Sequence, residues 1–475
     1  MTSVSGVHLA RLLADWRLAL PSGPAYARLA AAVRALLVDG RLPLAARLPA
    51  ERELATRLGV SRTTVTAAYD ALRADGYLHA RQGAGTFTAL PDEHVHQVAG
   101  WTAVRSAPGL DLAVASSEAL PGVVEAAVAR AVPRLGRHLR GHGYDVLGLV
   151  ELREAVAARY AARGLPTSPD QVVVTAGALA ATGLVARALL GPGDRVVVDT
   201  PTYPNALDVV RRAGGRLAGV ALDDDGWDLE RVEAAYRSAL PRLGHVVADF
   251  ANPTGHVLPE ADRARLVRAA ACAGTTLVVD ETLADVWLDA PPPPPVAAFD
   301  DDDGVVTVGS LSKSHWGGLR VGWVRAPRGL VARLAESRSA LDLAPPVLEQ
   351  LVAAELLADE DALDRRRALL RARRAALAAG LQEHCPGWTW REPAGGLVLW
   401  VRLDAPVATA LAAAAERHGV RLVPAGRFSV DGTGERHVRV PFALPEPVLA
   451  DAARRLAAAR AELDGVRGVP LAAVT

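Results

Sequence analysis

The chain has 475 residues, half of them apolar, and its formal net charge is zero. A chain of this length buries a sizeable core and divides into two or three domains. Its two cysteines, Cys272 and Cys385, exclude a disulfide framework or a cysteine metal cluster. No amino-terminal signal segment and no apolar run of spanning length are present, so we expect a soluble, cytoplasmic protein without a membrane or metal partner.

The charge is unevenly distributed along the chain. Residues 1–90 contain 11 arginines and 6 acidic residues, which leaves 42 basic and 47 acidic residues in the remainder. The first part is therefore about +5 and the rest about −5. This asymmetry predicts an anionic partner for the first part alone.

Residues 20–90 are predicted to form a small helical domain. A helical apolar pattern ends at Gly40, and a second helix extends roughly from Ala50 to Leu58 before Gly59 stops it. Ser61 then caps a third helix. Two short helices joined by a glycine-containing turn are typical of the helix-turn-helix, whose second helix enters the major groove of DNA.

The third helix carries polar side chains at its exposed start, including Arg62, Thr63 and Thr64. After it, residues 77–87 read as two short strands around a glycine-rich turn, which predicts a wing beside the helices.

The segment from about Tyr26 to Phe87 resembles the GntR family of winged-helix repressors. The resemblance is carried by the runs Arg47–Ala55, Leu58–Val65, Gly76–Leu78 and Gly83–Phe87. It implies a double-stranded DNA operator as partner, with phosphate contacts that position the domain and base contacts that specify the site. The DNA-binding residues that it implies are Arg52, Ser61, Arg62, Thr63, Thr64, and Gln82 and Gly83 at the wing tip.

Residues 91–110 show no sustained period and are predicted to be a linker. From 111 to 463, near-continuous apolar runs alternate with longer segments of helical spacing. Strands buried on both faces read this way, so we expect an α/β domain with a mostly parallel sheet, which binds ligands beyond the carboxyl ends of its strands. The predicted strands are 171–175, 195–199, 245–249, 276–280 and 305–309.

The basic residues are 52 arginines and a single lysine, Lys313, which follows the last of these strands. A desolvated lysine can lose its proton and attack an aldehyde, whereas arginine stays protonated. Hydroxyls precede Lys313 at Ser310 and Ser312, and Arg320 follows in a glycine-rich segment. This pattern suits an anionic aldehyde cofactor.

Further candidate ligand-binding groups, from both backbone and side chains, follow the other predicted strands. Ala178 and Leu179 begin a helix whose free N–H groups can hold a phosphate. Tyr203 places an aromatic ring on a loop, and the amide of Asn252 can donate to a phenolate oxygen. The carboxylate of Asp280 can keep a pyridinium nitrogen protonated.

Together these residues resemble the fold type I pyridoxal-phosphate enzymes, the aspartate aminotransferase class, over roughly residues 110 to 463. The motifs are Asn252–Gly255, Asp280-Glu281, Ser310–Lys313 and Arg320–Gly322. The resemblance implies a homodimer, a small-domain part at about 331–463, and Lys313 as the catalytic residue that forms an aldimine with pyridoxal 5'-phosphate. The cofactor-binding residues that it implies are Ala178, Leu179, Tyr203, Asn252, Asp280, Ser310, Ser312, Lys313, Arg320, and Tyr144 lent to the neighbouring subunit.

The run His437–Phe442 looks like a small-domain signature of the same class, which implies that Arg439 clamps the carboxylate of a substrate or effector. Members of the class usually carry a tyrosine shortly after the aspartate that holds the ring nitrogen. Thr282 and Leu283 stand there in this chain. We therefore expect transaminase activity to be weak or absent.

A GntR-like winged helix joined through a linker to an aminotransferase-like domain resembles the MocR group of bacterial regulators end to end. It implies a transcription regulator that depends on pyridoxal phosphate and senses an amino acid or an amine. One alternative is an active aminotransferase with an accessory DNA-binding domain. Another is a repressor that senses pyridoxal phosphate alone.

Overall fold

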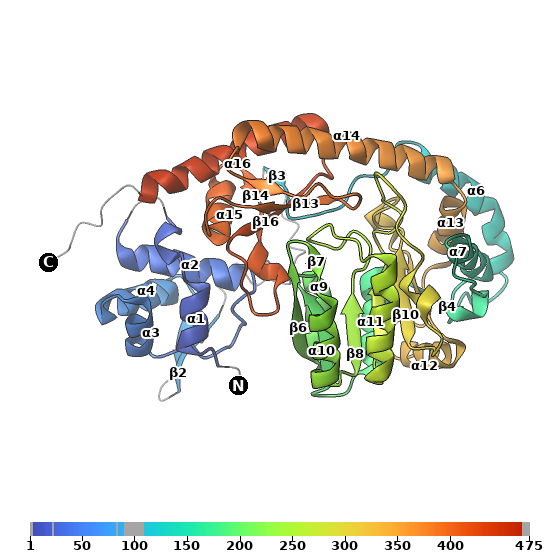
Figure 1. Cartoon of the computed structure of the whole chain (residues 1–475), viewed down its shortest axis with the longest axis horizontal. Helices are drawn as coiled ribbons and strands as arrows, with labels where there is room; N and C mark the ends of the chain where they lie inside the picture. The colour runs from blue at the N-terminus through green and yellow to red at the C-terminus, as the bar shows by residue number, and fades with distance from the viewer. Residues whose placement is uncertain (1–2, 21–22, 82–83, 90–108, 468–475) are drawn as a thin grey trace.

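The computed structural model describes residues 3–20, 23–81, 84–89 and 109–467. A winged helix lies at one end, a small α/β domain in the middle and a large α/β domain at the other end (Figure 1). Residues 91–108 of the predicted linker lie outside the described residues, as do Gln82 and Gly83 at the predicted wing tip.

The amino-terminal domain is a winged helix, as predicted. Gly59 ends the first helix of the helix-turn-helix with φ +65°, a conformation that glycine adopts without strain. The Ser61 side chain accepts a hydrogen bond from the Thr64 amide and caps the second helix. The elements are α2 (Ala25–Val38), α3 (Glu51–Leu58), α4 (Arg62–Ala74), β1 (Leu78–Arg81) and its antiparallel partner β2 (Gly85–Thr88).

The core of the winged helix begins earlier in the chain than residue 20. Leu9, Leu13 and Trp16 are buried in the same hydrophobic cluster as the apolar faces of α2 and α4. Leu9 lies in α1 (Gly6–Leu12), Leu13 follows the end of α1, and Trp16 begins η1 (Trp16–Leu18); neither element was predicted from the sequence.

The large domain is built on an eight-stranded sheet whose central strands are parallel. Its order is β4-β11-β10-β9-β8-β5-β6-β7, and β11 and β7 run antiparallel to their neighbours. The mostly parallel sheet was predicted. The strands are β4 (Val172–Thr175), β5 (Arg195–Thr200), β6 (Arg216–Asp223), β7 (Gly226–Trp227), β8 (Leu243–Val246), β9 (Thr276–Asp280), β10 (Val305–Ser310) and β11 (Gly322–Arg325).

Two hydrophobic clusters cover the two faces of this sheet. Successive side chains of a strand point to opposite faces, so Leu277 and Val279 belong to one cluster and Val278 to the other. The first cluster includes α6 (Val123–His138), α7 (Val150–Ala162), α10 (Leu229–Ala239), α11 (Glu260–Cys272) and α13 (Val347–Leu357). The second includes α8 (Ala178–Leu189), α9 (Pro204–Arg212) and α12 (Arg328–Arg338).

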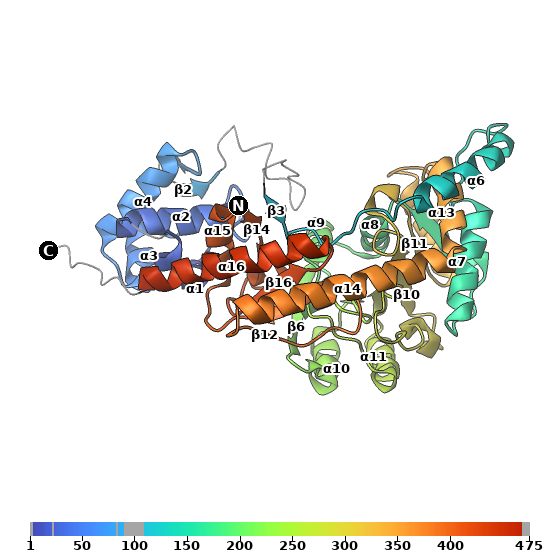
Figure 2. The same ribbon diagram turned by 90° about the horizontal axis from the view of Figure 1, so that it is seen from above.

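The small domain has a four-stranded sheet and a separate hydrophobic cluster. Its two long helices, α14 and α16, lie side by side in both views (Figures 1 and 2). Near the start of the aminotransferase-like part, β3 (Leu110–Asp111) pairs with β14 of this domain. The remaining elements are α14 (Glu360–His384), β12 (Thr389–Trp390), β13 (Val398–Arg402), α15 (Ala408–Arg417), β14 (Val420–Arg421), β15 (Val423–Pro424), η6 (Ala425–Phe428), β16 (His437–Pro441) and α16 (Glu446–Arg467).

Some strand predictions need correction. The strand expected at 245–249 occupies Leu243–Val246, because the chain leaves the ladder there and the carbonyl of Ala248 accepts from Leu258 instead. β6 was not predicted, although Leu217–Leu222 is an apolar run, because that run contains alanine and glycine where the predicted strands are rich in valine. β11 was not predicted either, because it lies inside the segment that was interpreted as a cofactor motif.

Candidate functional site

Lys313 lies in the turn after β10, at the carboxyl edge of the large sheet. Its Nζ donates to the carbonyl oxygen of Ala115 at 2.8 Å. Desolvation, together with the nearby Arg439 guanidinium, lowers the pKa of Lys313 to about 8, and Asp280 opposes the shift. An appreciable fraction of this amine is therefore unprotonated near neutral pH, as a nucleophile requires.

Asp280 ends β9, the strand parallel to and next to β10. Its Oδ1 accepts from the amide of Thr282 at 2.9 Å. Burial and then the charge of Asp280 raise the pKa of Tyr203, the residue that precedes α9. The Asp280 carboxylate thus acts on both Tyr203 and Lys313, so the predicted ring-nitrogen partner and the predicted stacking ring belong to one site.

Arg439 on β16 brings the small domain into this site. Its Nη1 lies 3.5 Å from the side-chain oxygen of Asn252, and its Nη2 donates to the carbonyl of Ala113. The residue is 1% exposed, and burial lowers the pKa of its guanidinium to about 9. A buried guanidinium that lies against neutral oxygens is well suited to bind a carboxylate.

A site for an anion lies at the start of α8. Gly177, with φ +93°, precedes the first helical residue, Ala178, so the free N–H groups of the helix point into the site. Arg320 donates from Nη2 to the carbonyl of Ala176 at 2.7 Å, and a Cβ at Gly177 would lie 2.8 Å from the same nitrogen. The guanidinium therefore lies over the amino-terminal end of α8.

Gly322 is required for this arrangement. A Cβ there would lie 2.8 Å from the Ala178 nitrogen and 2.7 Å from the Gly177 carbonyl carbon, closer than real Cβ atoms approach other atoms. In the sequence, Gly322 was identified only as part of the motif Arg320–Gly322, and no role was predicted for it. Its position between two strand ends explains why a glycine stands there.

Ser310 and Ser312 lie between β10 and Lys313. The Ser310 hydroxyl donates to the carbonyl of Val321 at 3.0 Å and accepts from the amide of Ser312 at 3.1 Å. Ser310 therefore fastens the lysine turn to the segment before β11. For both serines, the phosphate contact implied by the resemblance remains a prediction.

Glu281 follows Asp280 but points to the other side of the sheet edge. There it forms an ion pair with Arg163 at 2.7 Å, and Arg163 also contacts Asp249 at 3.2 Å. The neighbouring acids of the Asp-Glu motif thus separate, one toward Lys313 and one into a structural ion-pair network.

The predicted DNA-binding residues that the structure describes lie at the start of the recognition helix α4 and on α3. Arg52 is exposed, and the Arg62 side chain is 71% exposed, with its Nε 3.7 Å from Glu51. The hydroxyl of Ser61 contacts those of Thr63 at 2.7 Å and Thr64 at 2.8 Å, which orders the first turn of α4.

Comparison with known proteins supports both halves of the chain. Residues 115–456 match the family of class I and II aminotransferases, and residues 25–88 match the gntR family of bacterial regulatory proteins. An uncharacterized HTH-type transcriptional regulator, YdcR of Escherichia coli, is 32% identical over 450 residues, which cover 87% of this chain and 93% of that protein. A probable rhizopine catabolism regulatory protein, MocR of Rhizobium meliloti, is 29% identical over 433 residues, or 85% and 87% of the two chains.

Among solved structures, an alpha-aminoadipate aminotransferase from Thermus thermophilus, complexed with N-(5'-phosphopyridoxyl)-L-leucine, superimposes with a TM-score of 0.67. It is 28% identical and covers 76% of this chain and 93% of that one. The chain is a MocR-type member of the class I and II aminotransferase family.

Pyridoxal 5'-phosphate is the cofactor of this fold, and the residues of the MocR-type chain fit it. The glycine-lined start of α8 with Arg320 suits the phosphate, and Asp280 suits the pyridine nitrogen. Lys313 supplies a primary amine of lowered pKa beside both. Ala178 and Leu179 form the first turn of α8, whose amides have no partner within the helix, and their contact with the phosphate remains a prediction.

The MocR-type chain has Thr282 and Leu283, and therefore no phenol, two and three residues after Asp280. Leu283 is 8% exposed and packs into the hydrophobic cluster of the small domain. Thr282 presents its backbone amide to Asp280. Leu283 therefore contributes to the packing of the small domain.

Tyr144 stands apart from the other predicted cofactor residues. It lies in the loop between α6 and α7, is 61% exposed, and stacks on the ring of His142 at 5.7 Å. The resemblance assigns it to the phosphate of a neighbouring subunit, and this assignment remains a prediction.

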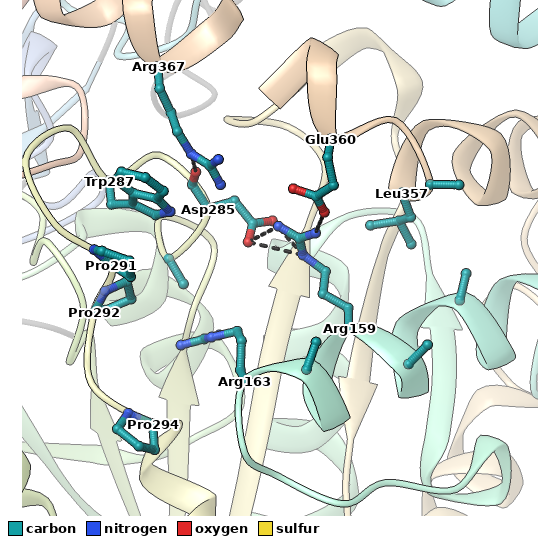
Figure 3. A pocket seen from close by; sticks show the side chains of 15 residues that line it. Arg159, Arg163, Asp285, Trp287, Pro291, Pro292, Pro294, Leu357, Glu360 and Arg367 are labelled. Atoms are coloured by element: carbon teal, nitrogen blue, oxygen red, sulfur yellow. Dashed lines mark hydrogen bonds and ion pairs between the residues drawn. The ribbon is translucent and has the colours of Figure 1, made fainter. Parts of the chain in front are cut away.

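A cavity of about 670 Å³ lies between α7 and the loop that carries Asp285 and Trp287 (Figure 3). Arg159 contacts Asp285 and also Glu360 at 3.2 Å, and Arg367 stacks on Trp287 at 4.2 Å. The lining of this cavity includes none of the predicted site residues.

In the described part of the chain, no helix has the length and hydropathy of a membrane span.

Proposed function

We propose that this protein is a DNA-binding transcription regulator that carries pyridoxal phosphate on Lys313 and senses an amino acid or an amine. The primary amine of Lys313 would hold the cofactor through its aldehyde carbon. The observation that carries the proposal is the meeting of Lys313, Asp280 and Arg439 in one site, in a chain that also has an exposed recognition helix.

When bound, the cofactor supplies an electrophilic carbon and an electron-withdrawing ring. The residues of the chain would bind and orient it. Arg320 and the start of α8 hold the phosphate, Asp280 holds the proton of the ring nitrogen, and Asn252 donates to the ring oxygen. Arg439 binds the carboxylate of an amino acid whose amine competes with Lys313.

The homodimer is also part of the proposal. The segment of the chain that contains Tyr144 also carries several exposed large apolar side chains, which a second copy of the chain would cover. This set is Val128, Val132, Leu139, Val146 and Val150. A dimer carries two winged helices, and two linked DNA-binding modules gain avidity for an operator with a repeated sequence.

An active aminotransferase with an accessory DNA-binding domain is the second candidate, because Lys313, Asp280 and Arg439 are also the groups that transamination needs. Turnover separates the two candidates. With Leu283 where a phenol is common, we expect little transamination of common amino donors with 2-oxoglutarate or pyruvate. Steady-state turnover on the order of 1–10³ per second would favour the enzyme.

Genome-wide mapping of bound DNA, with and without pyridoxal phosphate in the growth medium of a cofactor auxotroph, tests the proposal. We expect a small set of occupied sites that share a repeated sequence and whose occupancy changes with the cofactor. If no specific DNA sites are occupied under either condition, the proposal that the protein is a transcription regulator is wrong.

A further inference from the structure

The winged helix rests on the small domain through a buried ion-pair cluster. Arg41, in the loop after α2, has a side chain that is 3% exposed. Its Nη1 lies 3.3 Å from Oε1 of Glu435, and its Nη2 donates to the Thr409 hydroxyl at 2.9 Å. Asp39 accepts from Nε of Arg41 at 2.8 Å and orients the guanidinium toward the small domain.

A second contact lies beside the first. Arg11 of α1 donates to the backbone carbonyl of Asp431 at 3.3 Å and lies 3.5 Å from its carboxylate. Asp431 and Glu435 belong to the segment that joins η6 to β16. Both contacts of the winged helix therefore fall on one short stretch of the small domain.

The end of η6 nearest the cofactor site touches the residues that bind ligands. The guanidinium of Arg439 lies over the ring of Phe428, 4.9 Å from the ring centre, and Phe428 is fully buried. The carbonyl of Phe428 accepts from the amide of Thr202 at 2.8 Å, one residue before Tyr203. Phe428 thus contacts both the expected carboxylate clamp and the loop of the expected stacking ring.

Gly426 and Arg427 of η6 lie against the winged helix. A Cβ on Gly426 would lie 2.9 Å from Nη1 of Arg41, and a Cβ on Gly40 would lie 2.8 Å from Nη1 of Arg427. Glycine at these two positions allows the close approach. A 3₁₀ helix rises about 2 Å per residue, so η6 separates the two contacts by less than roughly 10 Å.

We infer that η6 mechanically couples the position of Arg439 to the seating of the winged helix on the small domain. The inference rests on the proposed function in one respect: Arg439 is the group that moves when a ligand binds. A carboxylate draws the guanidinium away from Ala113 and shifts its contact with Phe428. Because buried side chains have little free space around them, the shift displaces Gly426 and Arg427 against Gly40 and Arg41.

The ion pairs of Arg41 favour two distinct positions of the winged helix over intermediate ones. A small displacement that breaks the contact with Glu435 while Arg41 stays buried leaves its charge paired with Asp39 alone, which is unfavourable, whereas full separation returns Arg41 and Glu435 to water. The winged helix is therefore either seated or released, and packed interfaces of this kind switch between two states.

Hydrogen–deuterium exchange of the cofactor-loaded full chain tests the coupling without an operator or an effector. The reporters are the amides of Gly40 and Leu42, which donate to Leu37 and Leu36. In Arg439→Ala we expect these amides to exchange at least about fivefold faster than in the wild type. Phe428→Leu, which keeps an apolar side chain but removes the ring face, should have the same effect.

Val440→Ala is the matched control, because Val440 is the next residue on β16, is fully buried and packs into the core of the small domain. It should leave exchange at Gly40 and Leu42 within twofold of the wild type. The double variant Arg439→Ala/Glu435→Gln should exchange at Gly40 and Leu42 no faster than Glu435→Gln alone, since both changes act through one route.

Unchanged exchange at Gly40 and Leu42 in both Arg439→Ala and Phe428→Leu would overturn the coupling, and so would equal acceleration by Val440→Ala. The cofactor spectrum and operator binding of the wild type are measured separately. If the wild type shows no cofactor spectrum or no operator binding, the proposed function is wrong. The exchange rates of Gly40 and Leu42 would still show whether η6 couples Arg439 to the winged helix.

Discussion

The guanidinium of Arg439 lies 3.5 Å from the side-chain oxygen of Asn252, so the small and large domains meet within the cofactor site. One residue comes from β16 and the other from the loop after β8. A ligand carboxylate at Arg439 would therefore lie next to the amide expected to bind the cofactor's ring oxygen.

The lowered pKa of Lys313 predicts how cofactor capture depends on pH. The unprotonated amine is the reactive form, so the rate at which the apoprotein captures pyridoxal phosphate should rise with pH and reach half its maximum near pH 8. Asp280 raises the pKa of Lys313, so Asp280→Asn should move the midpoint to lower pH. Rapid-mixing absorbance measurements check both, and a midpoint near the ordinary lysine value of 10.5 would contradict the account.

Arg439→Ala should weaken the binding of amino acids by about 2–4 kcal/mol while the absorbance of the bound cofactor stays in place, because the substitution removes a buried partner of the carboxylate. Titration of the visible spectrum measures this affinity. The corresponding amines, which lack the carboxylate, provide the control and should lose little affinity. Equal losses for acids and amines would argue against a carboxylate clamp.

Gly322→Ala should lower the affinity for pyridoxal phosphate at least about tenfold, because the added Cβ would press on the start of α8. Gly183→Ala, within α8, is the matched control. A Cβ at Gly183 meets nothing within 4 Å, so this change should leave cofactor affinity unchanged and slightly stabilise the helix. Fluorescence titration of the apoprotein with the cofactor distinguishes the two variants.

Replacing Arg62 or Arg52 with alanine should weaken operator binding and leave the cofactor spectrum intact, since the two sites lie in separate domains. If the lost contact is to a phosphate, the salt dependence of binding should fall by about one unit; a base contact would instead relax specificity by roughly 1–3 kcal/mol at one position. Arg268→Ala removes an exposed charge from α11 of the large domain and should have no effect. Normal operator binding by both Arg62→Ala and Arg52→Ala would rule out the recognition-helix interpretation.

Local sequence signals account for the parts of the fold that were predicted. Gly59 and Ser61 fix the turn of the helix-turn-helix because a left-handed residue and a capping hydroxyl act within a few positions of the chain. The central strands were predictable because burial on both faces demands a continuous apolar run. β6 lies near one edge of the sheet, and its apolar run Leu217–Leu222 contains alanine and glycine where the central strands are rich in valine, so it was not recognised as a strand.

Contacts between distant segments could not be predicted in the same way. Three such contacts depend on how the winged helix, the small domain and the large domain pack together. They are the ring of Phe428 against Arg439, the carbonyl of Ala115 with Lys313, and the ion pair of Arg41 with Glu435. No periodicity in the sequence records such contacts. The site residues at strand ends were accessible because a parallel sheet brings its carboxyl ends to one edge whatever the loops between them.

The most direct test of the account is borohydride reduction of the cofactor-loaded protein followed by peptide mapping. Because Lys313 is the only lysine in the chain, the account predicts that the reduced cofactor is found on one peptide, the one that contains Lys313, and that Lys313→Ala abolishes both the label and the visible absorbance band. Absence of label on that peptide, or a label that persists on another peptide in Lys313→Ala, would contradict the central claim.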